Sequence, residues 1–166
     1  MRSVGGSAGE SRQLWEQGLE LQLLGDLERA AGLYRRSLDV AESAEAWTFL
    51  GWCHSWAGDL DEAVQACRRA IAVDPAFGNA HNDLGVYLLE LGEIDEAIAS
   101  LSAAKFCARY ETPQFPYLNT ARLLIRRGQL GAAAIELQAA RLLAPADPRI
   151  DELFEYVSVL VLARAA

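Results

Sequence analysis

Few residues in this chain of 166 have side chains that could do chemistry. Its histidines are His54 and His81, and its cysteines are Cys53, Cys67 and Cys107. A nucleophile needs a base beside it, and a zinc site needs several Cys or His ligands at short spacing. No Cys, Ser or carboxylate stands around either histidine at such a spacing. We therefore predict no catalytic residue, no metal site and no cofactor, and we expect both histidines and Cys67 to be packing residues.

An acidic cluster of Asp59, Asp61 and Glu62 is the other candidate for chemistry. It lacks the alternating oxygen ligands, the central glycine and the distant glutamate that a calcium loop requires. A helix N-terminus explains it better, because Asp59 can accept a hydrogen bond from a backbone N–H while Glu62 reaches back to the Asp59 N–H. We interpret Asp59 and Glu62 as a capping pair rather than as a cation site.

The composition restricts the class of partner. Fifteen Lys and Arg against 23 Asp and Glu give a formal net charge of −8. Such a chain repels phosphate backbones and anionic lipid head groups, so we expect neither nucleic acid nor a membrane as partner. Three widely spaced cysteines, no apolar run of signal-peptide length and a hydrophobic fraction of 52% predict one soluble, cytoplasmic protein with a sizeable core.

One motif recurs along the sequence with a period close to 34 residues, which indicates stacked structural repeats. Leu84 and Gly85 follow Leu50 and Gly51 at that distance, and a later copy is offset by 36 because two residues are added near positions 110–113. Three rows of positions are small in all four copies. They are Gly18, Gly51, Gly85 and Ala121; Ala30, Ala63, Ala97 and Ala133; and Ser37, Ala70, Ala104 and Ala140.

Each copy has the spacing of two amphipathic helices. Apolar residues recur at i, i+3, i+4 and i+7, as they do over positions 63–71 before the stop at Asp74 and Pro75. Glycines stand where each first helix ends, a place that favours the left-handed conformation. The pattern predicts first helices near residues 11–24, 44–57, 78–91 and 114–127, and second helices near 27–41, 60–73, 94–108 and 130–143.

Trp47, Leu50, Gly51, Ala63 and Pro75 have the spacing of the tetratricopeptide repeat signature, and the resemblance covers residues 11 to about 147. It implies an all-α, right-handed superhelical solenoid of about four helical hairpins. The expected organisation is a flexible N-terminal segment (1–10), four repeats (11–43, 44–77, 78–113 and 114–147) and a C-terminal capping helix (148–166).

The C-terminal helix carries more apolar residues than a cap needs. The residues that fit one apolar stripe are Ile150, Leu153, Phe154, Val157, Leu160 and Val161. Val159 and Leu162 lie outside that stripe. Two alternatives stay open, namely a wide contact with the last repeat and a surface for self-association or for a partner.

In the family that this sequence resembles, the first helix of each hairpin lines the concave inner surface, which holds an extended peptide or a partner helix. The resemblance therefore implies a set of partner-binding candidates on that face. They are Trp15, Leu19, Gln22 and Leu23; Thr48, Phe49, Trp52, Ser55 and Trp56; Asn82, Asp83, Val86, Leu89 and Glu90; and Leu118, Asn119, Arg122, Ile125 and Arg126.

The implied groove is aromatic and apolar in its N-terminal half and gains Arg122 and Arg126 toward its other end. Such a groove suits a hydrophobic segment followed by acidic residues, with Trp52 and Trp56 as its anchors. The alternative is that Phe49, Trp52 and Trp56 pack between hairpins, because large residues at helical spacing are often core residues.

The predicted function is that of a non-catalytic protein–protein interaction module that binds a peptide or helix of a partner. A carboxylate clamp of the kind that grips heat-shock chaperone peptides is not expected, since Trp15, Leu19 and Phe49 occupy places where those relatives have Lys and Asn. Two alternatives stay open. Residues 112–117 resemble a Pro-rich stretch of type III secretion chaperones, which hold hydrophobic clients. The C-terminal helix could instead join copies of the chain into a structural assembly.

Overall fold

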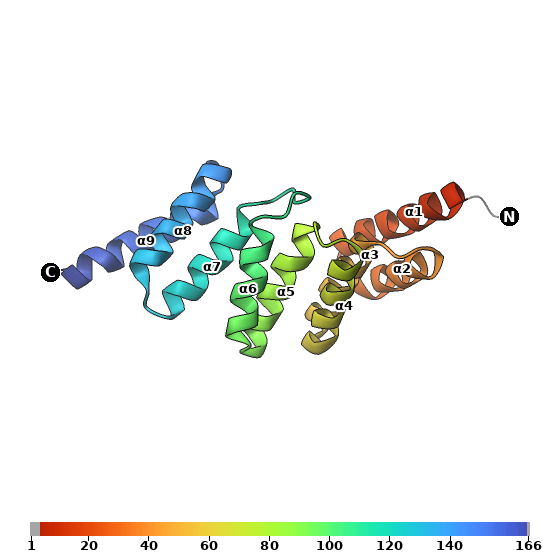
Figure 1. Cartoon of the computed structure of the whole chain (residues 1–166), viewed down its shortest axis with the longest axis horizontal. Coiled ribbons are helices and arrows are strands. Elements are labelled where there is room, and N and C mark those ends of the chain that lie inside the picture. Colours follow the sequence, from red (N-terminus) through yellow and green to blue (C-terminus); the bar gives the residue numbers. More distant parts are fainter. Residues whose placement is uncertain (1–3, 166) are drawn as a thin grey trace.

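Residues 4–165 are described by a computed structural model, in which they form nine α-helices joined by short connections. The helices pair into four hairpins that stack along one axis, with a ninth helix at the C-terminal end (Figure 1). The hairpins are α1 (Val4–Leu23) with α2 (Leu27–Val40), α3 (Ala44–Ala57) with α4 (Leu60–Val73), α5 (Gly78–Leu91) with α6 (Ile94–Ala104), and α7 (Phe115–Arg126) with α8 (Leu130–Leu143); α9 (Pro148–Ala165) follows. The predicted all-α solenoid of helical hairpins is confirmed.

Two predicted helix bounds differ from the structure. Residues 4–10, predicted as part of a flexible segment, form the first turns of α1, and residues 1–3 lie outside the described part of the chain. Ser11 fixes this helix, because its Oγ lies 2.9 Å from Ser37 Oγ and donates to the Ala41 carbonyl. Extending a helix that already exists costs little, since each added residue gains a backbone hydrogen bond. The second difference is α6, which ends at Ala104 rather than near residue 108.

The segment between α6 and α7 is held by Arg109. Backbone hydrogen bonds join Arg109 to the connection at residues 76–78, with the Gly78 N–H donating to the Arg109 carbonyl at 3.0 Å. The Arg109 guanidinium pairs with Glu45 at 2.6 Å and with Asp74, and it lies 4.5 Å from the centre of the Phe77 ring. These contacts end α6 early, because the chain beyond it follows the α4–α5 connection instead of continuing as a helix.

The two helices of a hairpin approach closely at the rows of small residues. A Cβ atom built at Gly85 would lie 2.7 Å from Leu101 Cγ and 3.2 Å from the Ala97 carbonyl oxygen. At Gly18 it would lie 2.6 Å from Cε1 of Tyr34. The predicted reason for the small residues is confirmed, since helix faces at this distance have no space for a larger side chain.

Glycine also makes the turn inside each hairpin. The four glycines with positive φ, between 71° and 88°, are Gly25, Gly58, Gly92 and Gly128. The predicted capping pair is wrong, because Asp59 precedes α4 without a side-chain hydrogen bond to the helix. Its carboxylate lies 3.9 Å from Nδ1 of His54 instead. Asp26 does cap α2 and accepts from the Arg29 N–H.

The core runs along the hairpin interfaces and continues into α9. Cys67 is fully buried, as predicted. Ile150 and Val157 of α9 are fully buried against the last hairpin, whereas Val159 and Leu162 are 64% and 70% exposed. Five of the six residues of the predicted stripe therefore pack against the last hairpin, whereas the sixth, Val161, is 41% exposed, and the two residues outside the stripe face solvent. No helix in residues 4–165 is long and apolar enough to cross a membrane.

The close approach at Gly85 predicts a specific cost for added volume. Gly85→Leu should lower the free energy of unfolding by about 1–3 kcal/mol, because the new side chain meets Leu101 and the α6 backbone. Gly32→Leu is the matched control, since Gly32 lies inside α2 and no atom lies within 4 Å of a Cβ built there. That variant should keep or slightly raise stability through helix propensity, worth about 0.5–1 kcal/mol. Urea unfolding of both variants measures the difference, and equal midpoints would contradict the steric account.

Candidate functional site

Four hollows follow one another along the face made by α1, α3, α5 and α7, and together we name them the groove. The N-terminal hollow has a volume of about 620 Å³ and the central hollow about 270 Å³, and Phe49, Asn79 and Tyr110 line both. The C-terminal hollow (about 140 Å³) and the terminal hollow (about 260 Å³) share Arg122. The central and C-terminal hollows share no lining residue, but a hydrogen bond between Asn119 and Asn82 joins their linings.

The structure brings fourteen of the nineteen predicted binding residues into this groove. Those of the N-terminal hollow are Trp15, Leu19 and Phe49; those of the central hollow are Gln22, Thr48, Trp52, Asn82 and Asp83, with Phe49 again; those of the C-terminal hollow are Val86, Leu89, Glu90, Asn119, Arg122 and Arg126. The repeat pattern could place them on one face because each occupies a similar position on the first helix of its hairpin. Their role in binding stays a prediction.

Five of the predicted binding residues line none of the four hollows. Leu118 is buried and Ile125 packs against the core of the last hairpin, whereas Leu23 is 80% exposed. Ser55 donates a hydrogen bond to the Trp52 carbonyl within α3.

Trp56 is the fifth. It lines a separate cleft of about 350 Å³ between α2 and α3, together with Leu27 and Ala31, and is 66% exposed. Its ring lies 5.3 Å from that of Trp52, one helical turn earlier. The prediction placed both tryptophans in the groove, but the last turn of α3 carries Trp56 past the groove to the edge of the first hairpin.

The aromatic residues divide into packing and non-packing members. Phe49 stacks on Tyr34 at 5.7 Å and lies 5.8 Å from the Trp15 ring, so both Phe49 and Trp15 pack against the core of the first hairpin while lining the N-terminal hollow. Trp52 and Trp56 belong to none of the buried clusters among the described residues. The alternative of packing between hairpins therefore holds for Phe49 and not for Trp52.

A chain of hydrogen bonds crosses the groove floor from α7 to α5. Arg122 Nη1 donates to Asn119 Oδ1 (3.3 Å), Asn119 Nδ2 donates to Asn82 Oδ1 (3.0 Å), and Asn82 Nδ2 donates to Asp83 Oδ1 (3.1 Å). Burial raises the pKa of Asp83 to about 6, although the hydrogen bond from Asn82 acts in the opposite direction. Both amides thus have fixed orientations, with each donating toward Asp83.

Arginines gather at the α7 end of the groove. Arg149 donates twice to Asp147, and its guanidinium lies 4.9 Å from the centre of the Phe115 ring. Partial burial lowers the pKa of Arg122, and the positive charges of Arg149 and Arg126 lower it further. Among the described residues neither Arg122 nor Arg126 has a carboxylate within ion-pair distance. Arg149 was missed at the sequence level because it lies on α9, beyond the repeats.

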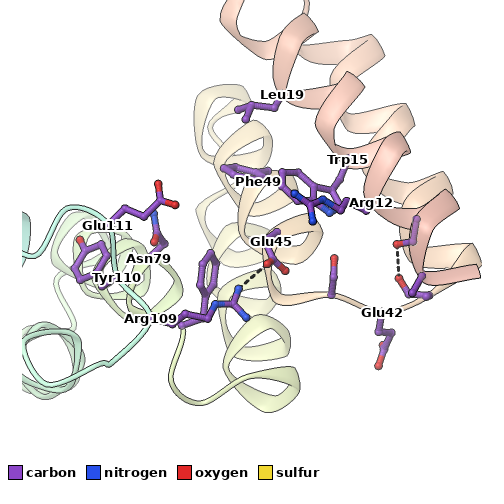
Figure 2. Close-up of a pocket in the computed structure, with 15 residues that line it drawn as sticks. Arg12, Trp15, Leu19, Glu42, Glu45, Phe49, Asn79, Arg109, Tyr110 and Glu111 are labelled. Carbon is purple, nitrogen blue, oxygen red and sulfur yellow. Dashed lines mark hydrogen bonds and ion pairs between the residues drawn. The ribbon is translucent and has the colours of Figure 1, made fainter. Parts of the chain in front are cut away.

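The connection between α6 and α7 forms the second wall of the N-terminal hollow. Figure 2 shows Trp15 and Phe49 between α1 and α3 on one side, and Asn79, Tyr110 and Glu111 on the other. Arg109 reaches from this connection to Glu45. The sequence marked these positions only as a two-residue insertion, so their contribution to the groove was missed.

Other side chains offer little for catalysis or metal binding. In the part of the chain that the structure describes, no three His, Cys, Asp or Glu side chains are placed to hold a metal ion. Cys53 is buried, and burial raises the pKa of its thiol to about 11, which disfavours the nucleophilic thiolate.

Two sequence models of the tetratricopeptide repeat match residues 44–77 and 66–99. The resemblance to the tetratricopeptide repeat is thereby confirmed over residues 44–99. A curated relative, the TPR repeat-containing thioredoxin TTL4 of Arabidopsis thaliana, is 27% identical over 99 residues, which are 59% of this chain and 14% of that protein. This chain therefore spans only a small part of the relative's length.

Solved structures share the fold of this chain. Pseudomonas aeruginosa pilF has a TM-score of 0.87 over 96% of this chain and 72% of its own, at 20% identity. PilW, a type IV pilus biogenesis factor, has a TM-score of 0.80 over 90% of this chain and 69% of its own, also at 20% identity. The second TPR of Spaghetti (RPAP3), bound to an HSP90 peptide, has a TM-score of 0.58 over 60% and 94%, at 20% identity. At these identities the likeness is one of fold.

The raised pKa of Asp83 predicts a pH-dependent effect on stability. Between its ordinary pKa of 3.8 and about 6, the folded chain binds more protons than the unfolded chain, so the contribution of Asp83 falls as pH rises through this range. Asp83→Asn removes this loss and keeps an acceptor for Asn82. The variant should gain stability relative to wild type between pH 4 and pH 7.5. Urea unfolding at both pH values tests this, and a constant difference between the two proteins would contradict it.

Proposed function

We propose that the chain is a non-catalytic protein-interaction module whose groove holds an extended or helical segment of a partner protein. The tetratricopeptide fold supports an interaction role at the level of the family. One neighbour of the same fold is bound to an HSP90 peptide, which shows that such a fold can hold a segment of another protein. The net charge of −8 supports a protein partner rather than a nucleic acid.

The observation that carries this proposal is the position of Trp52. Its side chain lines the central hollow beside Asn82 and Asp83, yet it contributes to none of the buried clusters among the described residues. Trp52 is only partly buried, so its ring has apolar area left for a ligand, and tryptophan is enriched among residues that dominate interface energetics. Phe49, by contrast, serves both the core and the groove.

Replacing Trp52 tests the groove directly. Trp52→Ala should weaken partner binding by about 10-fold or more, as expected for an anchoring aromatic residue, while helicity is retained. Trp56→Ala is the matched control, because it removes the same ring from a neighbouring position outside the groove. Wild type and both variants can serve as baits in a native cell extract, read by quantitative mass spectrometry.

The pattern of loss decides the result. A protein that is captured by wild type and by Trp56→Ala, but lost with a folded Trp52→Ala, would place the binding site in the groove. Equal capture by all three baits would remove the groove as the working surface. Loss with an unfolded Trp52→Ala would instead assign Trp52 to the core, against the present interpretation.

A second candidate function, assembly through α9, is favoured by the exposure of Val159 and Leu162. Two branched apolar side chains in solvent on one helix provide a self-association surface. If this surface joins copies of the chain, sedimentation should show a dimer at high micromolar concentration, and Val159→Asp with Leu162→Asp should dissociate it. A wild-type monomer at that concentration would remove this candidate.

A further inference from the structure

The charges along the groove are ordered, and this order specifies the chemistry of its occupant. In the N-terminal hollow both cations are already paired, Arg12 with Glu16 and Arg109 with Glu45 and Asp74. Two further carboxylates line the same hollow, those of Glu42 and Glu111. Both are exposed, and neither has a basic partner among the described side chains. The charge left for a ligand is therefore negative.

The floor of that hollow is aromatic. Trp15 and Phe49 lie 5.8 Å apart with their rings tilted by 33°, and the hollow also reaches Leu19 (Figure 2). A cation held over an aromatic face and near carboxylates is stabilised by both. The protein already shows this arrangement at the edge of the same hollow, where the Arg109 guanidinium lies over the Phe77 ring and pairs with Glu45. The N-terminal hollow thus suits a Lys or Arg side chain.

The C-terminal hollow has an excess of positive charge. Arg122 and Arg126 line it together with one carboxylate, Glu90, and neither arginine has a carboxylate within ion-pair distance in the described part of the chain. In the terminal hollow, Arg122 and Arg149 are accompanied by Glu152. The internal example here is Asp147, whose carboxylate accepts two hydrogen bonds from Arg149 and has its pKa lowered by that arginine and by Arg122. Carboxylates are therefore the groups that this end stabilises.

We propose that the groove binds one protein segment with a basic residue over Trp15 and Phe49, an apolar residue at Trp52, and acidic residues at Arg122 and Arg126. This rests on the proposed function and specifies its ligand. A uniformly anionic ligand does not fit, because Glu42 and Glu111 would repel it, and a uniformly basic one would be repelled by the arginines. The occupant is therefore a segment with separated charges of both signs.

The probe is a displayed library of randomised 15-residue peptides, selected on the full chain at low salt. Recovered peptides should carry Lys or Arg toward one end, Asp or Glu toward the other, and an apolar residue between them. We then compare the affinities of two synthetic peptides. The first is a copy of the best recovered peptide, and the second has its acidic and basic residues exchanged. Wild type should bind the first about 5- to 10-fold more tightly, and this preference should shrink at high salt.

Charge reversal in the groove allows a test by rescue, in which a peptide of altered charge restores the affinity that the variant loses. Glu42→Lys with Glu111→Lys should weaken the selected peptide by about 5-fold, and a peptide whose basic end is changed to Glu should recover that loss. Arg122→Glu with Arg126→Glu should also weaken the selected peptide, and a peptide whose acidic end is changed to a basic one should recover that loss. Glu62→Lys with Glu155→Lys is the control, because both residues are exposed and line none of the hollows described above. It should leave the affinity and the preference unchanged.

Three results would overturn the inference. If peptides are recovered and lost with Trp52→Ala, but show no charge order, the groove binds segments without the proposed polarity. If the two synthetic peptides bind equally well, the hollows do not discriminate between charges. The same conclusion follows if the control variant weakens binding as much as the charge reversals in the groove do. If no peptide is recovered, both the proposed function and this inference fail.

Discussion

The groove exists because helices in this chain approach one another at positions with no side chain to separate them. At Gly85 even one added carbon would lie 2.7 Å from Leu101. This contact sets the separation of α5 and α6, and its equivalents do the same in the neighbouring hairpins. Bulky residues such as Leu84 and Leu88 fill the core beside this contact. Other positions of the first helices, such as Trp52, remain only partly buried and line the groove.

The regular stack is interrupted once, and the interruption shapes the site. Two added residues after α6 allow the chain to lie along the α4–α5 connection, where Arg109 contacts both Glu45 and Asp74. Tyr110 and Glu111 then face α1 and α3 across the N-terminal hollow. A perfectly periodic repeat would leave that side open, so the largest hollow depends on the departure from the repeat.

Periodicity explains what could be predicted from the sequence and what could not. Hairpin pairing, the positive φ of the glycines and the shared face of fourteen candidate residues all follow from equivalent positions in successive copies. Asp59 has the residue type of a cap, but its carboxylate lies near His54 and makes no hydrogen bond to the first turn of α4. The position of Trp56 outside the groove depends on where α3 ends relative to α2, which the repeat pattern does not specify. The Arg109–Glu45 pair joins residues 64 apart in sequence, a distance at which no local pattern gives a signal.

The contacts of Arg109 have a consequence for cooperativity. In a solenoid each hairpin touches mainly its neighbours, so unfolding can proceed from the ends one unit at a time. Arg109 ties the approach to the fourth hairpin back to the second, both through its guanidinium and through the backbone at Gly78. Opening any one of these middle elements breaks contacts of the others. We therefore expect the second and third hairpins to open together, with amides that exchange more slowly than those at the two ends of the stack.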